Sequence, residues 1–97
     1  MNDLSGIKKT LKSHQRQLEE RFKVKEMALF GSYARNEYTE ESDLDILVDF
    51  KEPVGFEFIE LAEFLEKILE LKIDLVSRSG AMKSSRWEYI EKDLDYV

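Results

Sequence analysis

The sequence predicts a single α/β domain in which a small three-stranded mixed sheet is packed by helices. Three observations predict it. Segments with the apolar spacing of helices alternate along the chain with short apolar runs typical of strands. A helix-length segment joins the second run to the third, which makes these two strands parallel neighbours with a right-handed crossover. The 97 residues suffice for one modest core but not for a second domain, so we expect residues 1–97 to form one unit.

The chain opens with a predicted amphipathic helix over residues 3–22, with Asp3 or Ser5 near its start. Its apolar residues recur at helical spacing between polar positions; they are Leu4, Ile7, Leu11, Leu18 and Phe22. His14, the single histidine, lies within this helix. We expect a solvated or half-buried position for it rather than a catalytic one.

Two short apolar runs follow, separated by a polar turn. The first predicts a strand over 26–31, after which residues 32–36 form a turn of helix and a polar loop continues to Ser42. The second run predicts a strand over 43–50. The two strands should meet at one end of the sheet.

The second half of the chain repeats the helix and strand alternation. Residues 55–70 form a strongly apolar segment that predicts a helix buried against the sheet. Residues 72–76 predict a third strand, 77–80 a loop, and 82–96 a last helix that carries aromatic residues. The chain should therefore end on a helix.

Composition and charge restrict the classes of function. With 42% hydrophobic and 37% charged residues the chain should be soluble and globular. A net charge of -6 argues against a broad nucleic-acid surface, and the absence of cysteine excludes disulfides and thiolate zinc sites. No apolar run approaches a membrane span and the first residues lack a signal-peptide core. We expect a cytoplasmic protein that binds no membrane and no nucleic acid directly.

A glycine and two acids mark the turn between the first two strands. Asp43 and Asp45 should project to one side, roughly 6.5 to 7 Å apart along the backbone. Two like charges so placed favour a bound Mg²⁺, which prefers carboxylate oxygens. Gly31 would let a phosphate approach the backbone, and Ser32 would cap a helical turn that favours anions. The alternative for each short motif alone is a tight turn followed by a strand-end aspartate.

Asp74 is the third informative acid. It interrupts an otherwise apolar predicted strand, where a carboxylate is costly unless it is paired, bound to metal or protonated. If the third strand lies beside the second, Asp74 can join Asp43 and Asp45 in one cluster. Alternatively, Asp74 lies at an exposed edge or pairs with Lys72 or Arg78.

These residues resemble the signature of the DNA polymerase beta-type nucleotidyltransferases. The signature is read in Gly31-Ser32, ten intervening residues, Asp43-Leu44-Asp45, and a later lone Asp74. In so short a chain it is similar to the minimal nucleotidyltransferases (MNT) encoded beside HEPN-domain toxins. Asn36 departs from the pattern, since many relatives have glycine there. The resemblance implies the polymerase beta-like nucleotidyltransferase fold.

The resemblance also implies roles for the site residues. Asp43 and Asp45 would ligate two Mg²⁺ ions that bridge the phosphates of ATP, and Asp74 would complete the catalytic metal site and help activate the acceptor hydroxyl. Gly31 and Ser32 would hold the β- and γ-phosphates.

Three further polar residues are assigned less directly. Arg35 either contacts the triphosphate or braces its loop by pairing with Glu37 or Glu41. Ser42 is a candidate phosphate contact, although a turn or cap role suits this residue type better. Arg78 is a further candidate phosphate contact.

The resemblance implies Mg²⁺-dependent transfer of AMP, or another nucleoside monophosphate, from a nucleoside triphosphate to a hydroxyl. The acceptor would be a tyrosine of a partner HEPN RNase toxin, which makes this chain an antitoxin. Three alternatives remain: an antitoxin that acts by contact alone, a small-molecule nucleotidyltransferase of the antibiotic-modifying kind, and a structural metal-binding module. The Gly31-Ser32 cradle argues against the last.

Overall fold

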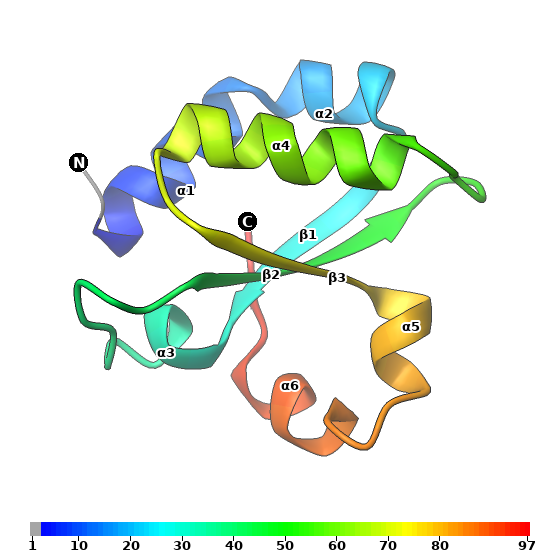
Figure 1. Ribbon diagram of the computed structural model, residues 1–97. Coiled ribbons are helices and arrows are strands. Elements are labelled where there is room, and N and C mark those ends of the chain that lie inside the picture. The colour runs from blue at the N-terminus through cyan, green and yellow to red at the C-terminus, as the bar shows by residue number, and fades with distance from the viewer. Residues whose placement is uncertain (1–2) are drawn as a thin grey trace.

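The computed structural model describes residues 3–97, which form a mixed sheet with the strand order β3-β2-β1-β4 (Figure 1). Strand β1 (Val24–Phe30) runs antiparallel to β2 (Leu44–Phe50), and β2 runs parallel to β3 (Ile73–Ser77). The expected three strands and their parallel pair are confirmed. A fourth strand was not expected: β4 (Asp95–Tyr96) pairs antiparallel with β1.

Three helices cover one face of this sheet: α1 (Leu4–Ser13), α2 (Gln15–Arg21) and α4 (Glu57–Leu69) (Figure 1). Helix α4 is the crossover between β2 and β3. The single helix expected over 3–22 is wrong in one respect, because the chain breaks at His14 and continues as α2. Within residues 3–97, no helix combines the length and the apolar character needed to cross a bilayer.

His14 explains this break. Its ring Nδ1 lies 2.9 Å from the carbonyl oxygen of Thr10, and the ring meets Phe64 edge-on at 5.7 Å between centroids. A side chain that bonds the preceding turn competes with the helical backbone. The half-buried position expected for this histidine is confirmed. At the start of α1, Asp3 caps the helix by accepting a 2.8 Å hydrogen bond from Gly6 N–H.

The opposite face carries two short helices, α5 (Arg78–Met82) and α6 (Trp87–Asp93) (Figure 1). A third short helix, α3 (Gly31–Ala34), lies at the end of β1, and its buried Tyr33 packs into the core on the side of α1, α2 and α4. Helix α3 follows β1 directly. The single last helix expected over 82–96 is wrong. The chain turns between α5 and α6, and Leu94 leaves α6 with ψ 121, which directs the backbone into β4.

The loop expected over 77–80 is also wrong. Ser77 ends β3 and caps α5, because its hydroxyl accepts a 3.1 Å hydrogen bond from Gly80 N–H. The strand therefore passes into a helix without an intervening loop.

Alternation along the strands divides the core into two layers. The larger layer lies under α1, α2 and α4 and includes Leu44, Ile46, Val48, Leu61 and Leu65. The smaller layer lies under α5 and α6 and contains Phe30, Leu47, Ala81 and Ile90. Since residues two apart on a strand share a face, Asp45 lies on the same side as Leu47. The acids of β2 therefore belong to the face that carries α5 and α6.

Candidate active site

The register of the sheet brings two of the predicted acids together. Asp45 in β2 and Asp74 in β3 are direct partners in the parallel pair, and Phe30, the last residue of β1, pairs with Asp45 on its other side. Gly31 follows immediately and begins α3. The glycine turn and the two acids therefore meet at one end of the strands, where β1 ends and β2 and β3 begin.

Gly31 is held against the Asp45 carboxylate. Its φ is +70°, a backbone conformation that residues other than glycine rarely adopt. A Cβ at this position would also collide with Asp45 Oδ2. The backbone of the turn can lie beside the carboxylate only because no side chain intervenes. The group that approaches this glycine is the Asp45 carboxylate, and the expected approach of a phosphate stays a prediction.

The pKa of Asp45 is shifted by its burial and by the neighbouring acids. This pKa is raised from 3.8 to about 6. Burial is the largest cause, followed by a hydrogen bond with Asp74 and the negative charges of Asp74 and Asp43, against the opposing charge of Arg86. Two carboxylates in contact cannot both ionise cheaply. The pair therefore favours a bound proton or a cation.

Asp43 contributes less to the arrangement. It lies one residue before β2, is exposed, and acts on Asp45 more weakly than Asp74 does. In residues 3–97, no three His, Cys, Asp or Glu side chains are gathered as a ready metal site. The expected cluster of three acids is thus present as a close pair with a third acid near it in sequence. The donor set of carboxylate oxygens beside a turn without a side chain nevertheless fits a hard divalent cation such as Mg²⁺.

The two serines differ from each other. Ser32 does not cap α3 as expected: the N-cap is Phe30, which makes no side-chain cap hydrogen bond, and Ser32 lies inside the helix. Ser42 is a turn residue, because its hydroxyl oxygen accepts a 2.9 Å hydrogen bond from Thr39 N–H. Only Ser32 is on an element that touches the acid pair.

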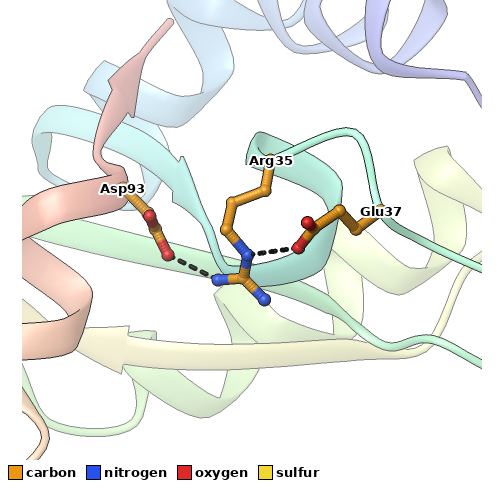
Figure 2. A network of polar contacts seen from close by, with 3 residues as sticks. All are labelled: Arg35, Glu37 and Asp93. Carbon is orange, nitrogen blue, oxygen red and sulfur yellow. Dashed lines mark hydrogen bonds and ion pairs between the residues drawn. The ribbon is translucent and has the colours of Figure 1, made fainter.

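Arg35 braces the turn, as Figure 2 shows. Its Nε donates to Glu37 Oε1 at 2.7 Å and its Nη1 donates to Asp93 Oδ2 at 2.6 Å. Of the two partners expected for the brace, Glu37 is the one used and Glu41 is not. The second bond ties α3 to α6, a link between segments 58 residues apart.

Arg78 lies elsewhere. Its guanidinium is 3.7 Å from Glu26 and from Asp49, and its Nη2 donates to the Tyr96 hydroxyl. Asp49 is four residues along β2 from Asp45, roughly 13 Å away at the rise of a strand. The structure does not bring Arg78 to the acid pair as a phosphate contact would require.

Arg86 was not among the expected site residues. Its Nη2 lies 3.9 Å from Asp74 Oδ2, and it lines a cleft of about 270 Å³ together with Gly31 and Asp45. It comes just before α6, in a segment expected to be the middle of a longer helix. The sequence assigned it no role, because only the packing of α6 over the end of β1 brings it to the acids.

A mixed sheet with paired carboxylates beside a glycine turn is an arrangement suited to metal-assisted phosphoryl transfer. The sequence pattern of the nucleotidyltransferase domain matches residues 11–97, and the chain belongs to this family of enzymes.

Two relatives match along their whole length. The chain is 46% identical over 98 residues to protein adenylyltransferase MntA of Thermococcus cleftensis, with 100% of this chain and 98% of the relative covered. It is 50% identical over 100 residues to a Methanocaldococcus jannaschii protein named as a candidate protein adenylyltransferase, with all of both chains covered.

Solved structures agree on the fold. A structure described as a candidate minimal nucleotidyltransferase superposes with a TM-score of 0.78 at 30% identity, covering 96% of this chain and 94% of that one. A second solved structure contains a tri-AMPylated Shewanella oneidensis HEPN toxin in complex with an MNT antitoxin. It superposes with a TM-score of 0.63 at 21% identity, covering 93% of this chain and 70% of that one. At that identity the likeness concerns the fold alone. The expected minimal nucleotidyltransferase fold is confirmed.

The raised pKa of Asp45 predicts a pH-dependent gain in stability for Asp45→Asn. A raised folded-state pKa stabilises the fold below about pH 4, and this contribution is lost as the pH rises through about 6. After discounting for partial exposure, the variant should gain about 1 kcal/mol of unfolding free energy at pH 7.5 and almost nothing at pH 4. Urea denaturation without divalent metal measures both values.

Glu40→Gln, which changes an exposed loop carboxylate, controls for net charge. An equal gain for Asp45→Asn at both pH values would show that the Asp45 carboxylate is not destabilised by its surroundings.

The collision at Gly31 predicts a cost for Gly31→Ala. The positive φ and the clash with Asp45 together should lower the unfolding free energy by about 1–3 kcal/mol. Gly55→Ala is the matched control, since a Cβ there meets nothing within 4 Å, and it should stay within about 0.5 kcal/mol of wild type. Equal denaturation midpoints for the two variants would contradict the close approach.

Proposed function

We propose that this nucleotidyltransferase moves AMP from ATP to a hydroxyl of a partner protein and releases pyrophosphate. The acceptor is a tyrosine of a HEPN-family toxin, whose RNase activity is thereby silenced, so the chain acts as an antitoxin. The observation that carries the proposal is the register pair of Asp45 and Asp74 beside Gly31.

The bonds that change account for what the site must do. The acceptor oxygen forms a bond to the α-phosphorus while the bond from that phosphorus to the bridging oxygen breaks, and pyrophosphate leaves with the bonding electrons. The hydroxyl proton passes to the Asp74 carboxylate. Asp74 suits this role because its side chain is 43% exposed, at the open edge strand, whereas Asp45 lies deeper in the sheet. The chain's work is therefore to position the phosphates and remove one proton.

Asp43, Asp45 and Asp74 are the residues that would hold Mg²⁺. When bound, the ion supplies charge neutralisation at the phosphates and lowers the pKa of an attacking oxygen. Gly31 lets the turn lie against the Asp45 carboxylate and lines the cleft in which the phosphates would bind, and Ser32 offers a hydroxyl beside it.

The acceptor is inferred from two supports. The Thermococcus relative is named a protein adenylyltransferase, which favours a protein as acceptor. The more distant Shewanella complex contains an AMPylated HEPN toxin together with an MNT antitoxin, which favours a HEPN partner.

The size of the cleft favours an acceptor that completes the site. At about 270 Å³ it is at or below the low end of small-molecule pockets, which run from roughly 300 to 1,000 Å³. It is also open to solvent, so an acceptor that docks there must supply the remaining wall. A small-molecule substrate therefore fits less well than a partner protein that covers the open edge.

Incubation with α-labelled ATP, Mg²⁺ and a HEPN toxin should transfer label to the toxin. Asp45→Asn and Asp74→Asn should each reduce the rate at least 100-fold, since each removes a carboxylate from the pair. Chelation of divalent cations should abolish transfer. Glu41→Gln, in the adjoining loop, should retain the wild-type rate, and a toxin whose acceptor tyrosine is replaced by phenylalanine should take up no label.

A toxin that remains unlabelled by wild type would contradict the transfer. The contact-only alternative is tested separately, by neutralisation of the toxin with the triple variant Asp43→Asn, Asp45→Asn, Asp74→Asn. The observation that favours it is the apolar exposure at the start of α4, where Phe56 is 82% and Ile59 is 58% exposed. If the triple variant still neutralises the toxin, contact suffices; if neutralisation fails with it, transfer is required.

A further inference from the structure

Two arginines line the cleft beside the acid pair. Its walls include Gly31, Arg35, Asp45, Arg86, Tyr89 and Asp93. A site for a polyphosphate needs a cation that can leave its resting partner and form new hydrogen bonds. The two arginines differ in whether they can do so.

Arg35 is committed to the fold. Both of its ion pairs are short, at 2.7 Å to Glu37 and 2.6 Å to Asp93, and they use separate nitrogens of the guanidinium (Figure 2). A phosphate that recruited Arg35 would have to break the link between α3 and α6. Its two carboxylate partners also neutralise its charge, so it attracts an anion weakly.

Arg86 is free to move. Its side chain is 59% exposed, and its one ion pair within residues 3–97 is the 3.9 Å approach to Asp74, which is too long for a hydrogen bond. Its backbone, in contrast, is fixed, because its N–H donates a 3.0 Å hydrogen bond to Ser84 Oγ and its carbonyl accepts from Ile90 N–H at 3.0 Å. A mobile guanidinium on an anchored backbone is poised at the mouth of the acid pair.

We propose that Arg86 is the phosphate-binding arginine of this site: its guanidinium rests near Asp74 and turns to the β- and γ-phosphates when ATP binds. This inference rests on the proposed function. The α-phosphorus must lie against the acids, where the acceptor attacks, so a cation on the cleft wall faces the remainder of the phosphate chain. Arginine suits this role because its planar fork binds phosphate oxygens bidentately. The assignment replaces Arg35, which the sequence alone had offered.

Binding titrations of ATP and of AMP, each with Mg²⁺, test the inference without an acceptor. Arg86→Gln should weaken ATP binding about tenfold and AMP binding less than twofold, because AMP lacks the phosphates that Arg86 holds. Arg86→Lys should recover part of the ATP affinity, since it restores the charge without the fork. Arg16→Gln, which alters a surface arginine that is 90% exposed, should bind like wild type.

The possible failures are distinguishable. Wild-type ATP affinity in Arg86→Gln overturns the role of Arg86 and leaves the proposed function standing. An equal loss for ATP and AMP also overturns it, because it indicates a disturbed site rather than a lost contact. A wild-type chain that binds no ATP overturns both. If AMP binds too weakly to titrate, the ATP affinities decide: glutamine and lysine variants equally weak would contradict a charge-based contact.

Discussion

The arrangement of the site depends on one electrostatically unfavourable contact, the approach of the Asp45 and Asp74 carboxyl groups across two parallel strands. The register of β2 and β3 forces it, since the two residues are direct partners in a ladder whose neighbouring pairs, Leu44 with Ile73 and Ile46 with Leu75, are apolar. Burial and mutual repulsion raise the pKa of Asp45 to about 6, which is a cost to the folded state at neutral pH. Folds retain such costs where function requires them. The neighbouring glycine turn and the nearby arginine are both arranged around this pair.

Most of the fold was predictable because short apolar runs indicate its strands and an apolar segment of helix length indicates its crossover. The expected strands at 26–31, 43–50 and 72–76 agree with β1, β2 and β3 to within two residues. The parallel pair followed from the length of the α4 crossover. The errors fall where a tertiary contact overrides periodicity. The first helix breaks where a histidine ring bonds the preceding turn, and the last segment ends in a two-residue strand that exists only because β1 offers an open edge.

The site was predictable in its acids and its glycine, and less so in its cations. If β3 lay beside β2, Asp74 was expected to join Asp43 and Asp45, and the register of the two strands pairs it with Asp45. The reason for Gly31 differs in detail from the expectation, because the group that a side chain would strike is the Asp45 carboxylate itself. The sequence allowed Arg35 either to contact the triphosphate or to brace its loop. Neither interpretation predicts its long-range hydrogen bond to Asp93. The role of Arg86 could not be predicted from local sequence patterns, since it lies next to Asp74 only after α6 folds across the end of the sheet.

The most direct test of this account is an NMR titration of the Asp45 side-chain carboxyl carbon, with and without Mg²⁺. We expect a midpoint near 6 in the absence of divalent cation, because burial and Asp74 raise the pKa of Asp45. Saturating Mg²⁺ should clearly lower that midpoint, because the ion favours the ionised form. A midpoint at the ordinary aspartate value of 3.8, or one near 6 that Mg²⁺ leaves unchanged, would contradict the claim that this acid pair is built to hold a cation.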